Sequence, residues 1–304
     1  MIIGLGGLGS VVLELLARQD GMGRIIVGSL ENAPSRALCN LARTGAVAQG
    51  YSPAIEFTPL DIDKPATVVD AVHRYRPDLI FSAATMQTWW LPNLLPDEQR
   101  TLIKSARHGM WLPTHLTHTL KLMRTLKDSN FEGFTLTAPY PDVINPILDR
   151  LGLAPTCGVG NVGEIEPKVR LLAAQQLGTP LEAVDVSLVA HHAMVSMAYS
   201  DAPQDTPPYF LRVKHNSEDV TQMIRPDELL LSPYPLPPGP ATHSLTAASI
   251  VPLIRAFFSD EPSRLHAPVT KAVPAFKNNP MLRMPASART MPPSTRTPRP
   301  KRFS

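Results

Sequence analysis

The sequence predicts an α/β protein in which a doubly wound parallel sheet is followed by a second, α+β domain. Three observations indicate this class. Short apolar segments alternate with amphipathic helical segments over residues 1–137, a glycine-rich turn joins the first strand to the first helix, and 19 of the 33 prolines lie after residue 202, where a regular parallel sheet cannot continue. With 304 residues, 43 % of them hydrophobic, the chain is long enough for two domains of about 150 residues.

The period of the apolar residues predicts the elements of the first half. Leu8, Val11, Val12, Leu15 and Leu16 recur at the spacing of one helix face, so a helix covers these residues. The same reasoning, together with turn residues at the boundaries, places strands at 1–3, 24–27, 55–60, 79–82 and 133–137 and helices at 35–42, 66–75 and 116–126.

The second half has fewer regular segments. After an irregular loop over 83–113, the remaining predicted elements are a helix over 166–177, a strand over 184–192 and a helix over 246–258. The end of the chain is rich in Pro, Ser, Thr and Arg and has little apolar surface to bury, so it is expected to be disordered. The predicted regions are a first domain over 1–150, a second over 151–280 and a basic tail over 281–304.

The charge distribution and the cysteine content exclude several classes of partner and site. The net charge is +3, but the tail over 281–304 contributes five arginines and one lysine without an acid, so the rest is mildly acidic and predicts no nucleic-acid partner. Cys39 and Cys157 lie far apart, which predicts neither a disulfide framework nor a metal site. The apolar runs are too short for a bilayer span and no signal peptide is recognisable, so a soluble protein of the reducing cytoplasm is expected.

The first turn carries the pattern Gly-x-Gly-x-x-Gly. Gly4 permits the tight turn, Gly6 lets the backbone approach a pyrophosphate, and Gly9 allows close packing of helix and strand, while the amides at the helix start favour an anion. Between a strand and an amphipathic helix this pattern predicts a Rossmann domain, with Gly7 and Leu8 also at the cofactor. The alternative is a tight turn in a fold that binds no cofactor.

The second strand predicts which dinucleotide is bound. An NAD site usually ends this strand with an acid for the adenine ribose, but the chain has Gly28 there, followed by Ser29. Ser29 and Arg36 can instead bind a 2′-phosphate, which predicts NADP, with NAD as the alternative. Glu31 favours that alternative, because it lies close enough to accept from the ribose hydroxyls.

Other strand ends supply further candidates. Asp61 and Asp63 follow the third strand and are expected to flank the adenine pocket, although an Asp that simply ends a strand is equally common. Ala83 and Ala84 follow the fourth strand and complete the predicted cofactor-binding set.

Several segments resemble the lactate and malate dehydrogenase superfamily over residues 1–195. Residues 16–31 look like malate dehydrogenases, including the Gly28-Ser29 pair that NADP-dependent members carry in place of the acid, and residues 112–137 continue the resemblance. The match ends at Ala138-Pro139, where the family has Asn-Pro, so the family's asparagine is missing. Residues 170–178 and 189–192 match the helix and strand that precede the family's catalytic histidine.

This resemblance implies a catalytic set. The histidine fourteen residues after the Leu-Gly glycine would be His192, and the family's substrate-carboxylate arginine falls on Lys168, which would then attract an anionic substrate. The family's aspartate falls on Ile165, so Glu164 or Glu166 must take its place. A carboxylate beside a histidine fixes the tautomer of a group that exchanges protons near neutral pH.

Other assignments keep two interpretations. His191 and His192 would face opposite sides of a strand, so at most one serves catalysis, and both can be structural. Asn161 either contacts substrate or makes a turn. Trp89 and Trp90 either close over the nicotinamide or pack between domains.

We therefore predict an NADP-dependent oxidoreductase that transfers a hydride between nicotinamide and a CH–OH or carbonyl group of a small anionic substrate. The cofactor would lie on residues 1–150 and the substrate groups on 151–280. One alternative is an enzyme acting on an amino-acid C–N bond, because residues 60–65 and 78–84 resemble saccharopine dehydrogenase-like proteins. Another is an NADP-binding sensor without turnover. The helix over 246–258 also allows a homodimer.

Overall fold

The computed structural model describes residues 1–105, 107–138, 140–199, 206–237, 239–260, 263, 265–268 and 270. The expected disordered tail over 281–304 lies outside these residues. No helix in the described part combines the length and apolar character required to cross a membrane.

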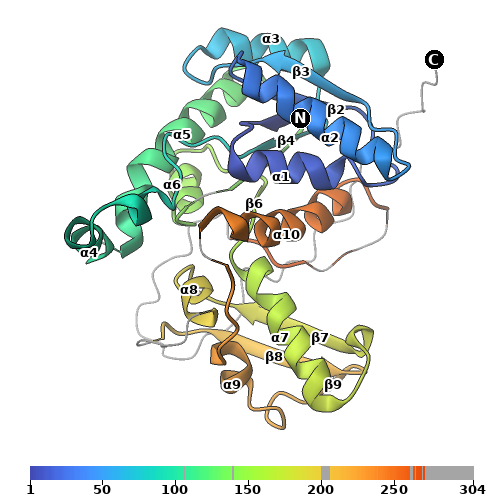
Figure 1. The fold of residues 1–304 in the computed structure, drawn as a ribbon, viewed down its shortest axis with the longest axis vertical. Helices are drawn as coiled ribbons and strands as arrows, with labels where there is room; N and C mark the ends of the chain where they lie inside the picture. The colour runs from blue at the N-terminus through green and yellow to red at the C-terminus, as the bar shows by residue number, and fades with distance from the viewer. Residues whose placement is uncertain are drawn as a thin grey trace.

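The first lobe, called here the N-terminal lobe, is built on a six-stranded parallel sheet (Figure 1). Its strand order is β3-β2-β1-β4-β5-β6, in which the chain starts at the centre and winds outward in both directions. The strands are β1 (Ile2–Ile3), β2 (Ile25–Ser29), β3 (Ile55–Pro59), β4 (Leu79–Ser82), β5 (Phe134–Thr137) and β6 (Cys157–Gly158). The predicted doubly wound sheet is confirmed.

Helices cover both faces of this sheet, which is why its central strands are apolar on both sides. On one face α1 (Gly7–Leu16), α2 (Ala33–Ala48) and α10 (His243–Ala256) share a buried cluster with the sheet. On the other, α3 (Pro65–Tyr75), α5 (Leu112–Asp128) and α6 (Ile144–Arg150) form a second cluster.

The C-terminal lobe is a three-stranded antiparallel sheet with its own apolar cluster (Figure 1). Its strand order is β7 (Val184–Val189), β8 (Phe210–His215) and β9 (Glu218–Asp219). Three helices complete it: α7 (Val162–Leu177), α8 (Met194–Ala198) and α9 (Pro226–Leu231). The predicted α+β character of the second half is therefore confirmed.

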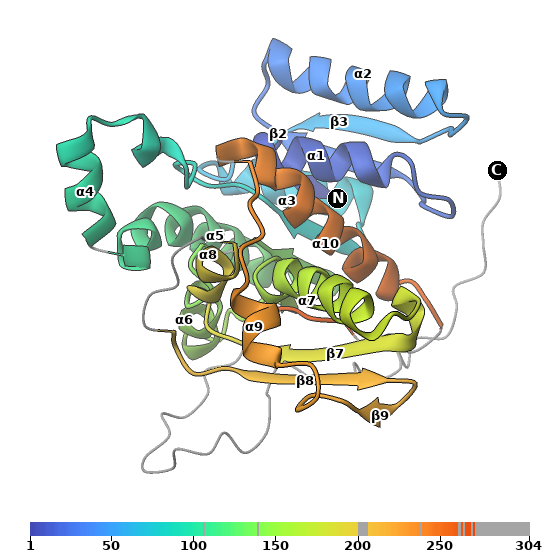
Figure 2. The ribbon, with the colours of Figure 1, turned by 60° about the horizontal axis from the view of Figure 1, so that its bottom comes forward.

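The segment expected to be irregular, 83–113, contains helical turns. It forms η1 (Leu91–Leu94), α4 (Asp97–Ser105) and η2 (Arg107–Trp111), and α4 projects from the body in both views (Figures 1 and 2). Asp97 and Glu98 in the first turn of α4 favour a helix start. The sequence did not predict α4 because this helix buries no apolar stripe against the rest of the protein. A surface helix is recognised in a sequence by the regular spacing of the apolar residues that form such a stripe.

Two elements beyond residue 150 lie in the N-terminal lobe. β6 pairs with β5 through Cys157 and Gly158, and α10 packs along α1 with Ala247 and Ile250 fully buried. The apolar side of α10, on which the expected homodimer rested, is thus used within the chain. The N-terminal lobe thus extends past the predicted boundary at residue 150 to β6, and the chain returns to it once, at α10, after the C-terminal lobe.

Candidate active site

A cavity of about 620 Å³ lies between the two lobes, beyond the carboxyl ends of β1 and β4. It is the place where ligands bind to open α/β sheets. The glycine turn borders it on one side and the residues after β7 on the other. Its lining includes Gly6, Gly7, Leu8, Ala83, Gln87, Trp89, His115, Tyr140, Asn161, Glu164, His192, Tyr199, Leu236, His243 and Thr246.

The glycine turn is held by contacts that exclude side chains. Gly4 has φ +92°, and its N–H donates to the carbonyl of Gly28 at 2.9 Å. A Cβ on Gly4 would lie 2.8 Å from the backbone of Ala84, and one on Gly9 would lie 2.0 Å from the carbonyl oxygen of Gly4. Gly4 thus makes a tight turn and Gly9 allows close packing of the helix, the geometry that the sequence predicts for these two glycines.

The middle of the turn fits a dinucleotide pyrophosphate. A Cβ on Gly6 would meet no atom within 4 Å, so its backbone is open to a ligand, and it is followed directly by the first turn of α1. A Cβ on Gly7 would lie 2.6 Å from the ring of His243, a residue of α10 that sequence analysis missed. Leu8 and Ala83 line the same cavity, while Ala84 supports Gly4 from behind.

His192 has a carboxylate partner that the sequence did not reveal. Its Nδ1 donates to Oδ1 of Asp142 at 2.7 Å, and their side chains are only 12 % and 19 % exposed. Asp142 follows β5, after the Ala-Pro-Tyr-Pro segment that breaks this strand. The family resemblance predicted this partner on α7, where Ile165 takes the family's aspartate position and is fully buried in the C-terminal lobe.

The location of His192 also differs from the expectation. β7 ends at Val189, three residues early, so both histidines lie in the turn that leads to α8. His191 is exposed, and its Nδ1 accepts from the N–H of Ala193 at 3.1 Å. The argument that strand neighbours face opposite sides therefore does not apply, but His192 alone of the two lines the cavity.

Burial lowers the pKa of His192, but the charge and hydrogen bond of Asp142, with help from Glu164, outweigh it and leave the pKa raised. Tyr140 packs edge-on against the imidazole at 5.0 Å between ring centres. Burial raises the pKa of Tyr140 to about 12 and lowers the pKa of His115, with a smaller effect of His192, to about 4. His115 and Tyr140 are therefore neutral where His192 is charged.

Glu164 lines the cavity as predicted and also caps α7. Its Oε1 accepts from the N–H of Asn161 at 3.2 Å. Burial raises the pKa of Glu164 to about 7, although a hydrogen bond from Thr246 and the charge of His192 oppose the shift. Glu164 acts on His192 through charge, whereas Asp142 holds the hydrogen bond that sequence analysis expected from a glutamate.

Lys168 lies away from the cavity, which corrects the prediction of a substrate-carboxylate site. It is 3 % exposed, and its Nζ donates to the carbonyls of Ala198, Leu230 (3.0 Å) and Ser232 (2.7 Å). Three carbonyls satisfy the three donors of an ammonium group. Lys168 thus joins α7, α8 and α9. Its position in the sequence matches that of the family's arginine, but such a match does not reveal the surroundings of the side chain.

Glu166 also lies away from the cavity lining. Burial raises its pKa, and the charged groups that act on it are Arg170 and Asp185 in the C-terminal lobe. It is therefore not the partner of His192.

Asn161 makes the turn that was one of its two interpretations, and contact with substrate stays a prediction. It has φ +52°, so it makes the turn before α7, and its side chain lines the cavity at 4 % exposure. Its Nδ2 donates to Oδ2 of Asp142. Its Oδ1 is buried without a hydrogen-bond partner among the described residues.

At the end of β2, the residues predicted to select NADP lie together. The hydroxyl of Ser35 donates to that of Ser29 at 3.3 Å, and both lie beside the start of α2. The guanidinium of Arg36 stacks on the Phe57 ring at 4.8 Å and donates to both carboxylate oxygens of Glu31, at 2.7 and 3.0 Å. Glu31 and Arg36, which favoured opposite cofactors in the sequence, form one exposed ion pair.

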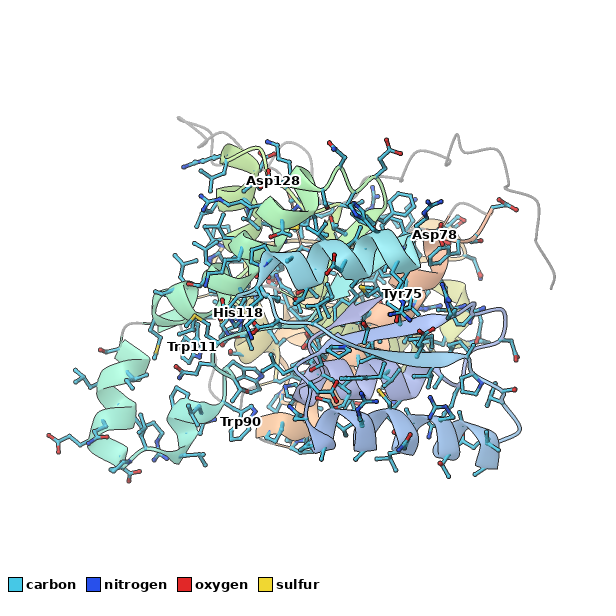
Figure 3. The ribbon with its side chains drawn as sticks, turned by 90° about the horizontal axis from the view of Figure 1, so that it is seen from above. Tyr75, Asp78, Trp90, Trp111, His118 and Asp128 are labelled. Atoms are coloured by element: carbon cyan, nitrogen blue, oxygen red, sulfur yellow. The ribbon has the colours of Figure 1, made fainter. Side chains whose placement is uncertain are left out.

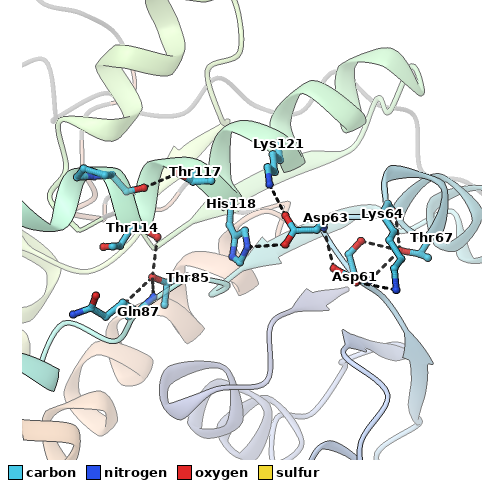
Figure 4. Close-up of polar contacts among 11 residues, drawn as sticks. Asp61, Asp63, Lys64, Thr67, Thr85, Gln87, Thr114, Thr117, His118 and Lys121 are labelled. Atoms are coloured by element: carbon cyan, nitrogen blue, oxygen red, sulfur yellow. Dashed lines mark hydrogen bonds and ion pairs between the residues drawn. The ribbon is translucent and has the colours of Figure 1, made fainter.

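The two aspartates after β3 form a hydrogen bond and ion pairs that stabilise the local structure (Figure 4). Asp61 Oδ1 accepts from the N–H of Asp63 at 3.0 Å, and its other oxygen pairs with Lys64 at 3.4 Å. Asp63 pairs with Lys121 of α5 at 2.5 Å and lies 3.7 Å from His118. Neither aspartate lines the cavity between the lobes, and their place beside the adenine pocket stays a prediction.

Trp90 and Trp111 lie on the side of the molecule from which α4 projects (Figure 3). Trp89 lines the cavity, and its carbonyl accepts from Nε1 of Trp111 at 3.0 Å. Tyr140 packs against both Trp89 and Trp111. Trp89 therefore forms a wall of the cavity, whereas Trp90 is not among its lining residues.

No protein-family model matches the chain, and no curated protein matches it in sequence. Solved structures do match. They include lactate dehydrogenase from Eimeria maxima with NADH and oxamate (TM-score 0.59, 10 % identity, 88 % of this chain and 77 % of that one). Malate dehydrogenases from Plasmodium falciparum and Cryptosporidium parvum both give a TM-score of 0.60, at 13 % and 14 % identity, over 88 % of this chain and 79 % of theirs. This chain therefore has the fold of the lactate and malate dehydrogenases, as its sequence resemblance predicted.

Proposed function

We propose that this protein is an NADP-dependent oxidoreductase that interconverts a CH–OH group and a carbonyl. The observation that carries the proposal is the place of His192, which is hydrogen-bonded to Asp142 and lines the same cavity as the glycine turn. A dinucleotide bound on that turn brings its nicotinamide into the cavity beside a positioned acid–base group.

The contacts within the site suggest a role for each residue. When bound, the nicotinamide supplies or accepts the hydride. Asp142 fixes the imidazole orientation through Nδ1, so the proton is exchanged with the substrate oxygen at Nε2. In reduction His192 donates this proton, and in oxidation it accepts one. Tyr140, Trp89 and Tyr199 provide an apolar wall that limits access of water to the reacting atoms.

The raised pKa of His192 favours reduction near neutral pH. Asp142 and Glu164 keep the imidazole protonated to higher pH than burial alone would allow. A protonated acid is the form that carbonyl reduction requires, so reduction should decline as pH rises through the pKa of His192.

The preference for NADP rests on the end of β2. Ser29, the hydroxyl of Ser35 and the amides at the start of α2 form a polar place for a 2′-phosphate, and Arg36 adds a charged donor after turning from Glu31. Arg36→Ala should then weaken NADPH at least about tenfold while changing NADH little. If NAD is the cofactor, Glu31→Gln should weaken NADH instead.

The proposal as a whole is tested by titrating the protein with NADPH and NADH and following intrinsic fluorescence. Cofactor oxidation is then measured with ketones, 2-oxo acids, their amides and imino acids. Turnover of carbonyl compounds that is lost in His192→Asn supports the proposal. Turnover of imino acids alone would replace it with C–N chemistry, and tight cofactor binding without any turnover would indicate a sensor.

A further inference from the structure

The cavity lining has an unusual charge content for a site that was expected to bind an anion. Among its described residues none is lysine or arginine. The one acid among the described lining residues is Glu164, which adds negative charge when ionised. The one histidine with a raised pKa, His192, is already paired with Asp142. A substrate carboxylate would thus lose its hydration without gaining a cationic partner, which is strongly unfavourable.

Two buried polar atoms at this cavity require a hydrogen-bonding partner and not an anion. Oδ1 of Asn161 and Nε2 of His115 are both buried and lack a hydrogen-bond partner among the described residues. Their side chains are 4 % and 7 % exposed, and both residues line the cavity. A buried polar atom without a partner costs about 1–3 kcal/mol, so a ligand that pairs with it recovers this free energy.

The chemistry of these atoms defines the ligand. An amide oxygen only accepts, so Asn161 Oδ1 needs a donor such as a hydroxyl or an N–H group. Burial keeps His115 neutral, with its pKa near 4, so it binds an uncharged polar group better than an anion. Trp89, Tyr140, Tyr199 and Leu236 add apolar and aromatic surface around these atoms.

Resting on the function proposed above, we infer that the substrate is an uncharged carbonyl or hydroxy compound with an apolar body and a second polar group that donates to Asn161 Oδ1. A 2-oxo or 2-hydroxy carboxamide is such a compound, and so is a hydroxyketone. This inference replaces the small anionic substrate expected from the sequence, because that expectation depended on Lys168.

The test compares 4-phenyl-2-oxobutanamide with 4-phenyl-2-oxobutanoate, which differ only in the amide and carboxylate groups. We expect kcat/KM for cofactor oxidation to be at least about tenfold higher for the amide. Equal or higher kcat/KM for the acid would overturn the inference and leave the oxidoreductase proposal standing.

A binding experiment separates the two proposals. N-benzyloxamide and N-benzyloxamate cannot be reduced in the assay, so calorimetry with bound cofactor measures recognition alone. Tighter binding of the amide supports the inference even if no compound turns over, in which case only the oxidoreductase proposal fails. Tighter binding of the oxamate, or no binding of either at millimolar concentration, overturns the inference.

Gln87 offers a gain-of-charge variant with a matched control. It lines the cavity in the segment after β4, and its backbone, not its side chain, makes the contacts with Thr85. Gln87→Arg places a cation there, and the amide-to-acid ratio of kcat/KM should fall at least about tenfold. Gln87→Met keeps a similar length without charge and should leave the ratio unchanged. An unchanged ratio in Gln87→Arg would contradict selection by charge.

Discussion

Asp142 connects two side chains of the candidate site. Its two carboxylate oxygens accept from different elements, Oδ1 from His192 after β7 and Oδ2 from Asn161 at the start of α7. One side chain thus fixes the orientation of the imidazole proposed to exchange the proton and of the amide that faces the cavity. Asp142 acts through His192 and Asn161, so it is a positioning residue.

Replacing Asp142 should change both the rate and its pH dependence. In Asp142→Asn the charge that raises the pKa of His192 is gone, while burial, which lowers it, remains. We expect the decline of reductive kcat/KM with rising pH to move to lower pH, with a loss of about a hundredfold at pH 7. Steady-state rates from pH 5 to 9 measure both.

Asp128→Asn, an exposed change at the end of α5, is the control and should leave the profile unchanged. An unaltered pH profile of reductive kcat/KM in Asp142→Asn would show that Asp142 does not set the protonation of His192.

Glu164 should make the stability of the protein pH-dependent. Its pKa rises from 4.5 in the unfolded chain to about 7 in the folded one, chiefly through burial. The folded state therefore holds the proton more tightly, so this contribution is complete below pH 4.5 and is lost as pH rises through 7. Relative to Glu164→Gln, the free energy of unfolding of the wild type should fall by about 2–3 kcal/mol across this window.

Urea unfolding of both proteins at pH 4.5, 6 and 8 checks this expectation. The glutamine keeps an oxygen for the N–H of Asn161, so the cap of α7 is preserved. A constant difference between the two proteins at all three pH values would contradict the raised pKa.

At the scale of elements, the glycine turn and α1 could be predicted in detail because their signals are local. The glycine spacing requires a tight turn, and the apolar period fixes one buried helix face. α4 lacks such a stripe and was missed. The end of β7 depends on where its pairing with β8 stops, at Val189 opposite Phe210, and no residue before His192 marks it.

The glycine turn allows folding and binding to be tested separately. Gly6 has φ −83° and open space around it, so Gly6→Ala should change Tm by less than about 2 °C but place a methyl group where a pyrophosphate approaches. We expect cofactor affinity to fall at least about tenfold. Gly9→Ala, by contrast, puts a Cβ 2.0 Å from a carbonyl and should lower Tm as well.

Thermal unfolding and cofactor titration of both variants check this contrast. Gly23→Ala, where a Cβ meets nothing within 4 Å, is the control and should retain both stability and affinity. Full cofactor affinity in Gly6→Ala would place the pyrophosphate elsewhere.

At the scale of the whole molecule, the cavity depends on long-range contacts that a local pattern does not contain. Asp142 meets His192 across 50 residues of sequence, and His243 reaches Gly7 because α10 returns to the N-terminal lobe. Lys168 shows the converse, since its spacing matched a substrate site whereas its environment is three backbone carbonyls. The fold class was predictable, but the membership of the site was only partly so.

The return of α10 should support both stability and cofactor binding. Ile250 is fully buried against α1 and the sheet, so Ile250→Ala leaves a cavity and should cost about 2–4 kcal/mol of unfolding free energy. Because α10 also carries His243 to Gly7, cofactor affinity should fall as well. Denaturant unfolding and cofactor titration measure the two effects.

Arg255→Ala removes only an exposed hydrogen bond from α10 to Gln19 and should cost less than about 1 kcal/mol. An Ile250→Ala protein as stable as this control would show that α10 does not anchor the N-terminal lobe.

The hydrogen bond between Asp142 and His192 joins a residue after β5 to a residue after β7, and so ties one sheet to the other. The proton affinity of His192 therefore depends on a contact between the two lobes. Without this contact His192 would lose the counter-charge that raises its pKa, so it would release its proton at a lower pH. The pH at which the His192 imidazole titrates, followed by its chemical shift, would then report whether this contact between the lobes is intact.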